Sequence, residues 1–474
     1  MPTPFLRGAV VRAVALGLAV LLSPRCASAI GLNLSGVVSF NGSTGDTPFS
    51  GVILANDGNL YGTTFYGGSS PLPGSGSGLV YQLKTNGLLS PLALFYGTNG
   101  ANPYARPLQG SDGYLYGTTS LGGTNGLPNG YGTVYRVSTN GALATLVHFD
   151  GTKGASPSGP LILGADGNYY GTTSYGGTNG GKGTVFRMTP AGALTSLFSF
   201  NGTNGSNPYS GVMQGQDGAL YGTTLLGGTN GNWGTVFRIT TNGAFSSLFS
   251  FNGTNGANPY GGLVQSTNGL LYGTAYYGNS GFNGQNSSGF GSVYSISTNG
   301  QLVTLYSFTG GNDGGEPYAA LALGNDGNFY GTTTLFGAGG FGTVFQITPQ
   351  ALLTTIVPFS YGMNGITPYG RLLPLSSGSF YGTASSAGAY GRGTVFRLDP
   401  ASPVLTGANS SGGRFTFSWS ALPGQMFQVQ YRTNLATTLW FSLGQPIVAT
   451  NTTVTVSDTW FSNRNCSYRV SVLP

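Results

Sequence analysis

The sequence predicts an all-β protein: a seven-bladed β-propeller with four-stranded antiparallel blades, followed by a small C-terminal β-sandwich. Two observations carry the first part, and a change of composition after residue 400 carries the second. The tripeptide Tyr-Gly-Thr recurs in units of about fifty residues, which is typical of solenoids and propellers. Its tyrosines are Tyr61, Tyr116, Tyr170, Tyr221, Tyr272, Tyr330 and Tyr381.

A typical unit also contains four short runs rich in Val, Phe, Tyr, Leu and Thr, separated by Gly, Asn, Asp or Pro. In one unit these runs cover 211–214, 219–224, 234–240 and 244–251. Asp217-Gly218 joins the first pair and Asn242-Gly243 the second, and both dipeptides favour tight hairpins between antiparallel strands. Four antiparallel strands repeated seven times predict seven blades around a central axis.

The two ends of the repeat region predict how the ring closes. The last unit stops after its third strand, at 393–398, and lacks a fourth. Residues 35–40 have the pattern of a fourth strand, with no first, second or third strand before them. We therefore expect 35–40 to complete the blade formed by 369–398, so that no strand edge is left unpaired.

The Tyr-Gly-Thr motif itself is interpreted as scaffold. We expect each tyrosine ring to lie between blades and each following glycine to admit the backbone of the neighbouring blade. The acidic residues at the first hairpin of five units are interpreted as turn residues, because Asp bonds readily to the turn backbone. They are Asp57, Asp112, Asp166, Asp217 and Asp326.

The N-terminus has the pattern of a secretory signal. Arg7 and Arg12 precede the apolar run 13–22, and the small residues 27–29 suit a cleavage site. The run is too short for a stable membrane span. We therefore predict a signal peptide at 1–29, a propeller at 30–400, no transmembrane segment in the mature chain, and a secreted, extracellular or cell-surface location.

After residue 400 the composition changes from Gly, Asn and Tyr to Ser, Thr and Val. Alternating polar and apolar residues predict half-buried antiparallel strands, and hence a sandwich at 401–474. Trp419 on an early strand and Tyr468-Arg469-Val470 near the end resemble a fibronectin type III or immunoglobulin-like module. The simplest interpretation is a spacer or adhesion module with no chemistry of its own.

The repeated unit Leu-Tyr-Gly-Thr-Thr, Gly-Gly, Gly-Thr-Val-Phe, Phe-Asn-Gly-Thr-Asn-Gly resembles the GloVer tandem repeat of secreted bacterial proteins. The resemblance extends over residues 34–400. It implies export and surface display. It implies no established activity and no catalytic residues that could be assigned to this sequence.

Charge and composition exclude several classes of function. The formal net charge of +6 falls to +3 once three arginines leave with the signal peptide, with 14 basic against 11 acidic residues remaining, so no nucleic-acid surface is expected. His148 is the only histidine, which argues against histidine-rich metal sites. We expect no cofactor and no metal. Asp313 and Glu316 leave open a polysaccharide-degrading enzyme, although a solvated loop with unperturbed pKa values, or a weak calcium contact, is the simpler interpretation.

One position at the end of the variable loop varies among the units. It directly precedes the glycine that opens the third strand, and its four aromatic and two basic side chains are a candidate surface for sugar rings or a protein partner. The alternative is that each ring only packs on its neighbouring loop. We call these seven the rim residues: Ser77, Tyr131, Lys182, Trp233, Phe290, Phe341 and Arg392.

A second departure from the repeat lies where the first strand begins. Five units have a small residue or proline there, whereas two have Arg106 and Arg371. Near a channel mouth, two guanidinium groups could bind a carboxylate, for example on an acidic glycan, or else backbone carbonyls. We expect both to point toward the rim residues. The sequence thus predicts a monomeric, non-catalytic protein that binds glycan or protein, with a purely structural cell-surface role as another alternative.

Overall fold

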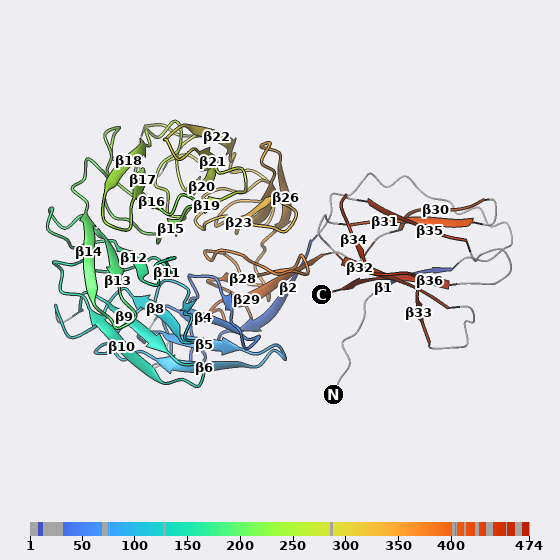
Figure 1. The fold of residues 1–474 in the computed structure, drawn as a ribbon, viewed down its shortest axis with the longest axis horizontal. Coiled ribbons are helices and arrows are strands. Elements are labelled where there is room, and N and C mark those ends of the chain that lie inside the picture. The colour runs from blue at the N-terminus through green and yellow to red at the C-terminus, as the bar shows by residue number, and fades with distance from the viewer. Residues whose placement is uncertain are drawn as a thin grey trace.

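The computed structural model describes residues 8–12, 32–68, 74, 76–126, 129–284, 288–400, 403, 405–411, 414–421, 426–432, 439–451, 453–459 and 467–473. Strands are the regular secondary structure of these residues, and among them no helix is long and apolar enough to cross a bilayer. Seven four-stranded antiparallel sheets form the blades. Figure 1 shows them around a centre, with short strands such as β15 inside and long strands such as β18 outside.

The strands of the first three blades follow one another in chain order. Blade 1 contains β3 (Ile53–Leu54), β4 (Leu60–Thr64), β5 (Leu79–Leu83) and β6 (Leu89–Leu94). Blade 2 contains β7 (Leu108–Gln109), β8 (Leu115–Thr119), β9 (Thr133–Val137) and β10 (Leu143–His148). Blade 3 contains β11 (Ile162–Leu163), β12 (Tyr169–Thr173), β13 (Thr184–Met188) and β14 (Leu194–Ser199).

The next three blades repeat this plan. Blade 4 contains β15 (Met213–Gln214), β16 (Leu220–Thr224), β17 (Thr235–Ile239) and β18 (Phe245–Ser250). Blade 5 contains β19 (Val264–Gln265), β20 (Leu271–Ala275), β21 (Ser292–Ile296) and β22 (Leu302–Ser307). Blade 6 contains β23 (Ala322–Leu323), β24 (Phe329–Thr333), β25 (Thr343–Ile347) and β26 (Leu353–Pro358). The four runs predicted from the sequence of blade 4 are confirmed, although β15 is only two residues long.

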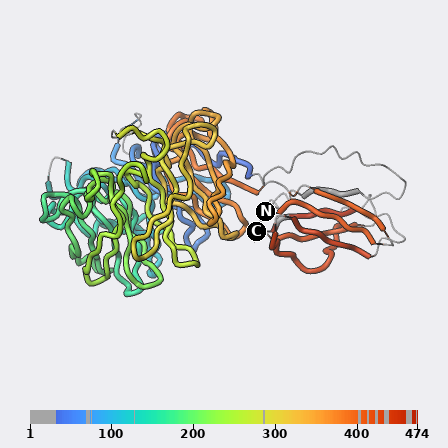
Figure 2. The backbone as a smooth tube through the Cα atoms, turned by 90° about the horizontal axis from the view of Figure 1, so that it is seen from above, coloured from blue at the N-terminus to red at the C-terminus, as the bar shows by residue number. Residues whose placement is uncertain are grey.

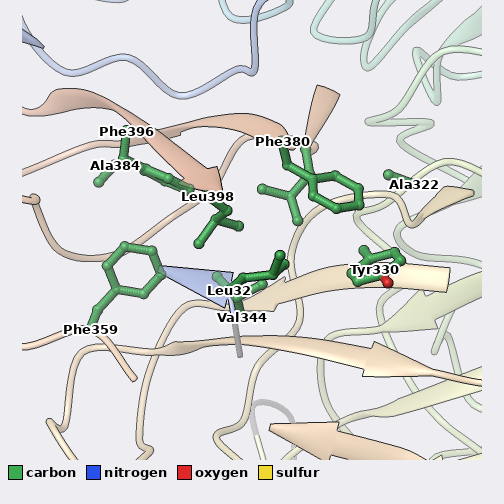
Figure 3. Packing of buried hydrophobic residues seen from close by; sticks show 10 residues of the cluster. Leu32, Ala322, Tyr330, Val344, Phe359, Phe380, Ala384, Phe396 and Leu398 are labelled. Carbon is green, nitrogen blue, oxygen red and sulfur yellow. The ribbon is translucent and has the colours of Figure 1, made fainter. Parts of the chain in front are cut away.

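Blade 7 takes its outer strand from the start of the repeat region. It contains β27 (Leu373–Pro374), β28 (Phe380–Ala384), β29 (Thr394–Pro400) and β2 (Leu32–Ser39). β2 runs antiparallel to β29, from Leu32 opposite Pro400 to Ser39 opposite Thr394, with a shift of register between Gly36 and Val38. Figure 3 shows Leu32 close to Val344 and Leu398, in a core shared by blades 6 and 7. The predicted clasp of the two ends is confirmed.

Two hydrogen bonds join each blade to the next, and both also join blade 7 to blade 1. In the first, the carbonyl of a rim residue accepts from a backbone N–H at 2.7–3.2 Å; the closing member runs from Thr47 to Arg392. In the second, the threonine of Tyr-Gly-Thr donates to a backbone carbonyl in the turn that leads into the next inner strand. Thr172 to Ser210 is one example, at 2.7 Å, and Thr383 to Ser50, at 2.8 Å, closes the ring.

The other two residues of the motif act within one blade. The tyrosine hydroxyl donates to the turn aspartate of its own blade, as from Tyr61 to Asp57 at 2.6 Å and from Tyr170 to Asp166 at 2.6 Å. The glycine lies opposite the aromatic residue of the third strand. A Cβ on Gly222 would lie 2.5 Å from Cζ of Phe237. The glycine therefore admits a ring from its own blade, and the expectation that it admits the neighbouring backbone is wrong.

We expect the folded protein to lose stability at alkaline pH, because these tyrosines have raised pKa values. Burial, followed by the hydrogen bond to the aspartate, raises the pKa of Tyr61 and of Tyr170 from 10.0 to about 12. Because the pKa is higher in the folded state, the stabilisation is fully present below pH 10 and is lost as the pH rises toward 12. We expect the urea midpoint to fall over this range in the wild type. It should fall less in a Tyr61→Phe/Tyr170→Phe variant, and an equal fall would contradict this account.

The C-terminal region forms two sheets at one side of the propeller (Figure 2). One contains β30 (Leu405–Ser411), β31 (Arg414–Ser420) and β35 (Thr453–Asp458). The other contains β1 (Gly8–Arg12), β36 (Ser467–Leu473), β32 (Met426–Arg432), β33 (Phe441–Ser442) and β34 (Ile447–Val448). Trp419, Phe427 and Tyr468 are buried in one core, where the Tyr468 hydroxyl donates to Asp458 at 2.6 Å. The resemblance to fibronectin type III stays a prediction.

β1 comes from the segment predicted to be a signal peptide. Its five residues pair with β36, from Gly8 opposite Ser471 to Arg12 opposite Ser467. The small residues at 27–29 lie outside the described part of the chain. Export and cleavage at this segment therefore remain proposals.

Candidate functional site

Six aromatic side chains meet at one end of the central channel. In each unit a residue with a left-handed backbone precedes a proline, and in six units an aromatic residue follows that proline. This turn carries the chain from the outer edge of one blade to the inner strand of the next. We call the six aromatics the mouth ring: Phe49, Tyr104, Tyr209, Tyr260, Tyr318 and Tyr369. Blade 3 has Ser158 at this position.

The members of the mouth ring touch one another. Phe49 stacks on Tyr104 with ring centroids 5.0 Å apart, and Tyr260 stacks on Tyr318 at 4.7 Å. Tyr104 also meets Tyr209 edge-on at 5.2 Å, across the unit that lacks an aromatic. The hydroxyls of Tyr104 and Tyr318 share a hydrogen bond of 2.7 Å. The rings are half-buried, so they present a mixed apolar and hydroxyl surface at the channel end.

Burial keeps these hydroxyls neutral. It raises the pKa of Tyr260 from 10.0 to about 12, and it raises the pKa values of Tyr104 and Tyr318 further. Neighbouring tyrosines add to the shift of each, since ionising one phenol disfavours ionising the next. At neutral pH the ring therefore offers uncharged donors and acceptors.

The mouth ring and the beginnings of the inner strand regions line a cavity of about 180 Å³. Arg106 from blade 2 and Arg371 from blade 7 contribute to its wall. The five remaining units place Gly51, Pro160, Gly211, Gly262 and Ala320 at the same level. The two arginines are thus the charged side chains of the cavity lining.

Both arginines lie deep in the molecule while keeping part of their surface exposed to the cavity. Burial lowers the pKa of Arg106, and burial together with the charge of Arg106 lowers the pKa of Arg371 from 12.5 to about 10. Within the described residues, neither guanidinium forms an ion pair or a hydrogen bond. The described residues therefore give no support to the alternative in which the two arginines bond to backbone carbonyls.

The rim residues do not form part of this cavity. Their shared role is the carbonyl hydrogen bond between blades, which explains why the side chain at this position varies so freely. Trp233 packs on Phe282, and Phe290 on Phe336, with centroids 5.2 and 5.1 Å apart. The half-buried ring of Phe341 has Tyr361 at 6.4 Å.

The remaining rim positions differ in exposure. Tyr131 and Lys182 are exposed, whereas Arg392 pairs with the buried carboxylate of Asp46 at 3.2 Å. That ion pair connects blade 7 to blade 1. The rim residues thus make separate contacts. Tyr131, Lys182 and Trp233 are the members that remain candidates for a binding surface. Arg106 and Arg371 lie beside the mouth ring in the cavity lining, and their predicted direction toward the rim residues stays a prediction.

Asp313 and Glu316 face different partners. The carboxylate of Asp313 accepts from the backbone and side chain of Thr309, at 2.8 and 2.6 Å, within its own turn. Glu316 accepts from the Tyr276 hydroxyl of the preceding blade, at 2.6 Å. Burial raises the pKa of Glu316, which corrects the expectation that both pKa values are unperturbed. Asp313 is thus engaged as a turn residue.

The closed ring of repeated blades and the aromatic channel mouth define a β-propeller repeat protein. The model of the Gloeobacter/Verrucomicrobia repeat matches residues 74–287 and 277–416, which together cover more than half of the chain. The protein belongs to this repeat family. No curated protein matches it at a significant level.

Solved structures with a similar arrangement share little sequence with it. The extracellular domain of BT3049 from B. thetaiotaomicron is 12% identical, with a TM-score of 0.48; the match covers 91% of this chain and 56% of that one. A PL25 ulvan lyase bound to a GlcA-Rha3S saccharide is 10% identical, with a TM-score of 0.47 and coverages of 76% and 96%. The GH93 α-L-arabinofuranosidase of Fusarium graminearum is 15% identical, with a TM-score of 0.37 and coverages of 62% and 92%.

The mouth ring is the feature that sequence reasoning missed. Its signal is present in the chain, because Pro-Tyr or Pro-Phe recurs in six of seven units, two residues before the arginine position. This step was not predicted to be functional, because a residue that repeats in every blade is usually part of the scaffold. At a propeller axis, however, a repeated side chain converges with its copies and forms a surface that no single blade has.

Proposed function

We propose that this protein is an exported, non-catalytic glycan-binding protein whose ligand docks on the mouth ring. The observation that carries the proposal is the convergence of six half-buried aromatic side chains at one end of the channel. Aromatic rings with polar edges suit sugars, because a ring face packs on C–H groups while hydroxyls bond at the rim. The N-terminal signal pattern supports export.

A binding role also fits the acidic residues near the mouth. Asp313 accepts hydrogen bonds from its own turn and Glu316 accepts one from Tyr276, so each carboxylate has a structural partner of its own. The low charge content and the aromatic surface favour a glycan over a nucleic acid. Among macromolecules, glycans match this surface best, and a protein ligand is an outcome of the test.

The test is a glycan array probed with residues 30–474, followed by calorimetry on the best saccharide. Tyr260→Ala should weaken binding about fivefold or more, because each stacking contact contributes roughly 1 kcal/mol or more. Tyr96→Ala is the matched control, since Tyr96 is exposed away from the channel. Equal losses for both variants, or binding only to protein ligands, would contradict the proposal. Release of reducing ends from the bound glycan would instead favour an enzyme that uses Glu316.

A further inference from the structure

We propose that the channel cavity is an anion-binding site, in which Arg106 and Arg371 together bind a carboxylate or sulfate group of an acidic saccharide. The saccharide part of this statement rests on the proposed function, whereas the anion site stands on the two arginines alone. Neither residue belongs to the repeat, so the site exists once per ring.

The position of the two arginines brings their charges into one space. Blades 2 and 7 flank blade 1, which has Gly51 at the same level. The backbones are crowded here, because a Cβ on Gly51 would lie 2.1 Å from the carbonyl oxygen of Arg371. Because Gly51 of blade 1 has no side chain at this level, the cavity occupies the region between the two guanidinium groups.

The electrostatics of this space require a negative partner. The two arginines are deep in the molecule, and the charge of Arg106 acts on Arg371. The ion pairs among the described residues involve Arg238, Arg392 and Arg397, and none involves the channel arginines. Two buried like charges without a counter-charge destabilise the folded state. A bound anion would relieve that repulsion, which provides free energy for binding.

The chemistry of the wall selects the kind of anion. Planar guanidinium groups bind carboxylate, sulfate and phosphate oxygens with paired hydrogen bonds. At about 180 Å³ the cavity is smaller than the roughly 300–1,000 Å³ of sites that enclose a drug-sized ligand. It therefore suits one anionic group or one sugar unit, while neighbouring units would lie on the mouth ring.

Glu316 does not fill this role. It lies beside the mouth ring, where its charge adds to the effect of burial in raising the pKa of Tyr369, and its carboxylate accepts a hydrogen bond from the Tyr276 hydroxyl. Among the described residues it forms no ion pair with either channel arginine. The positive charge of the cavity thus remains available to a ligand.

The anion site is tested first without any glycan. Thermal unfolding of residues 30–474 is measured in sodium sulfate and in sodium chloride at equal ionic strength, for the wild type and for Arg106→Gln/Arg371→Gln. Sulfate stabilises many proteins without binding, so the readout is the difference between the two proteins. We expect near-saturating sulfate to add about 3 °C more to the wild type than to the variant.

Two further comparisons complete this arm. Lys84→Gln removes an exposed cation in a blade 1 turn, and it should keep the wild-type response to sulfate. The double arginine variant should unfold at the wild-type temperature or higher in chloride, because it loses a buried like-charge pair. The same sulfate response in the wild type and the double variant would overturn the anion site.

A second arm identifies the source of the anionic group. Trigalacturonic acid, its methyl ester and a sulfated galactose oligosaccharide are titrated calorimetrically. We expect at least about tenfold tighter binding of one acidic form than of the ester, and loss of that preference in the double variant. Equal binding of acid and ester would overturn an acidic ligand. A sulfate response without binding of any saccharide would retain the anion site and reject the glycan proposal.

Discussion

Removal of residues 30–41 should lower the stability of the whole propeller. β2 supplies the outer strand of blade 7, and the deletion exposes the edge of β29. It also removes Phe40, which is fully buried and packs edge-on against Tyr81 of blade 1, with centroids 5.0 Å apart. Lost ladder hydrogen bonds and buried apolar area together cost roughly 5–10 kcal/mol. We expect the unfolding temperature to fall by about 5–10 °C, measured by calorimetry against residues 30–474.

A peptide added in trans separates this effect from general damage. A synthetic peptide of residues 30–41 should restore part of the lost stability to the truncated protein, because it can pair with the free edge of β29. A scrambled peptide of the same composition serves as the control. An unchanged unfolding temperature after deletion would show that the ring does not depend on the clasp.

Gly222→Ala should destabilise blade 4 strongly for so small a change. The added methyl group would lie 2.5 Å from Cζ of Phe237, in a core where Phe237 is fully buried. The ring cannot move without displacing its neighbours, so the cost is about 1–3 kcal/mol. Chemical denaturation of the purified variant measures it. Gly362→Ala is the control, because a Cβ there meets only one atom, at 4.0 Å.

A double-mutant cycle tests the stated cause. Phe237→Leu frees space opposite Gly222, so the two substitutions together should cost less than the sum of the single changes. Additive losses would mean that Gly222 is needed for some reason other than the Phe237 ring. The same arrangement recurs in the other units, for example between Gly171 and Phe186.

The sequence was sufficient for the architecture because its signals are local and repeated. Hairpin dipeptides and alternating apolar residues predict each blade, and the missing fourth strand of the last unit predicts the role of β2. The atomic reasons for the motif were less accessible. That Gly222 faces a ring of its own blade depends on the register between β16 and β17, which spacing alone does not give.

The candidate site was predicted only in part. Arg106 and Arg371 stood out because they break the repeat. The mouth ring around them was not predicted, because its residues lie up to 320 positions apart in the sequence, between Phe49 and Tyr369. The rim residues attracted notice because they vary. The side chain varies because the contact between blades is a hydrogen bond to the backbone carbonyl of this position.

A crystal structure of residues 30–474 soaked in sodium bromide would test the closed ring and its channel most directly. The account predicts seven blades, with residues 32–39 paired to β29, and an anomalous bromide peak between Arg106 and Arg371. An open arc of sheets, or guanidinium groups paired with protein carboxylates and no bromide between them, would contradict it.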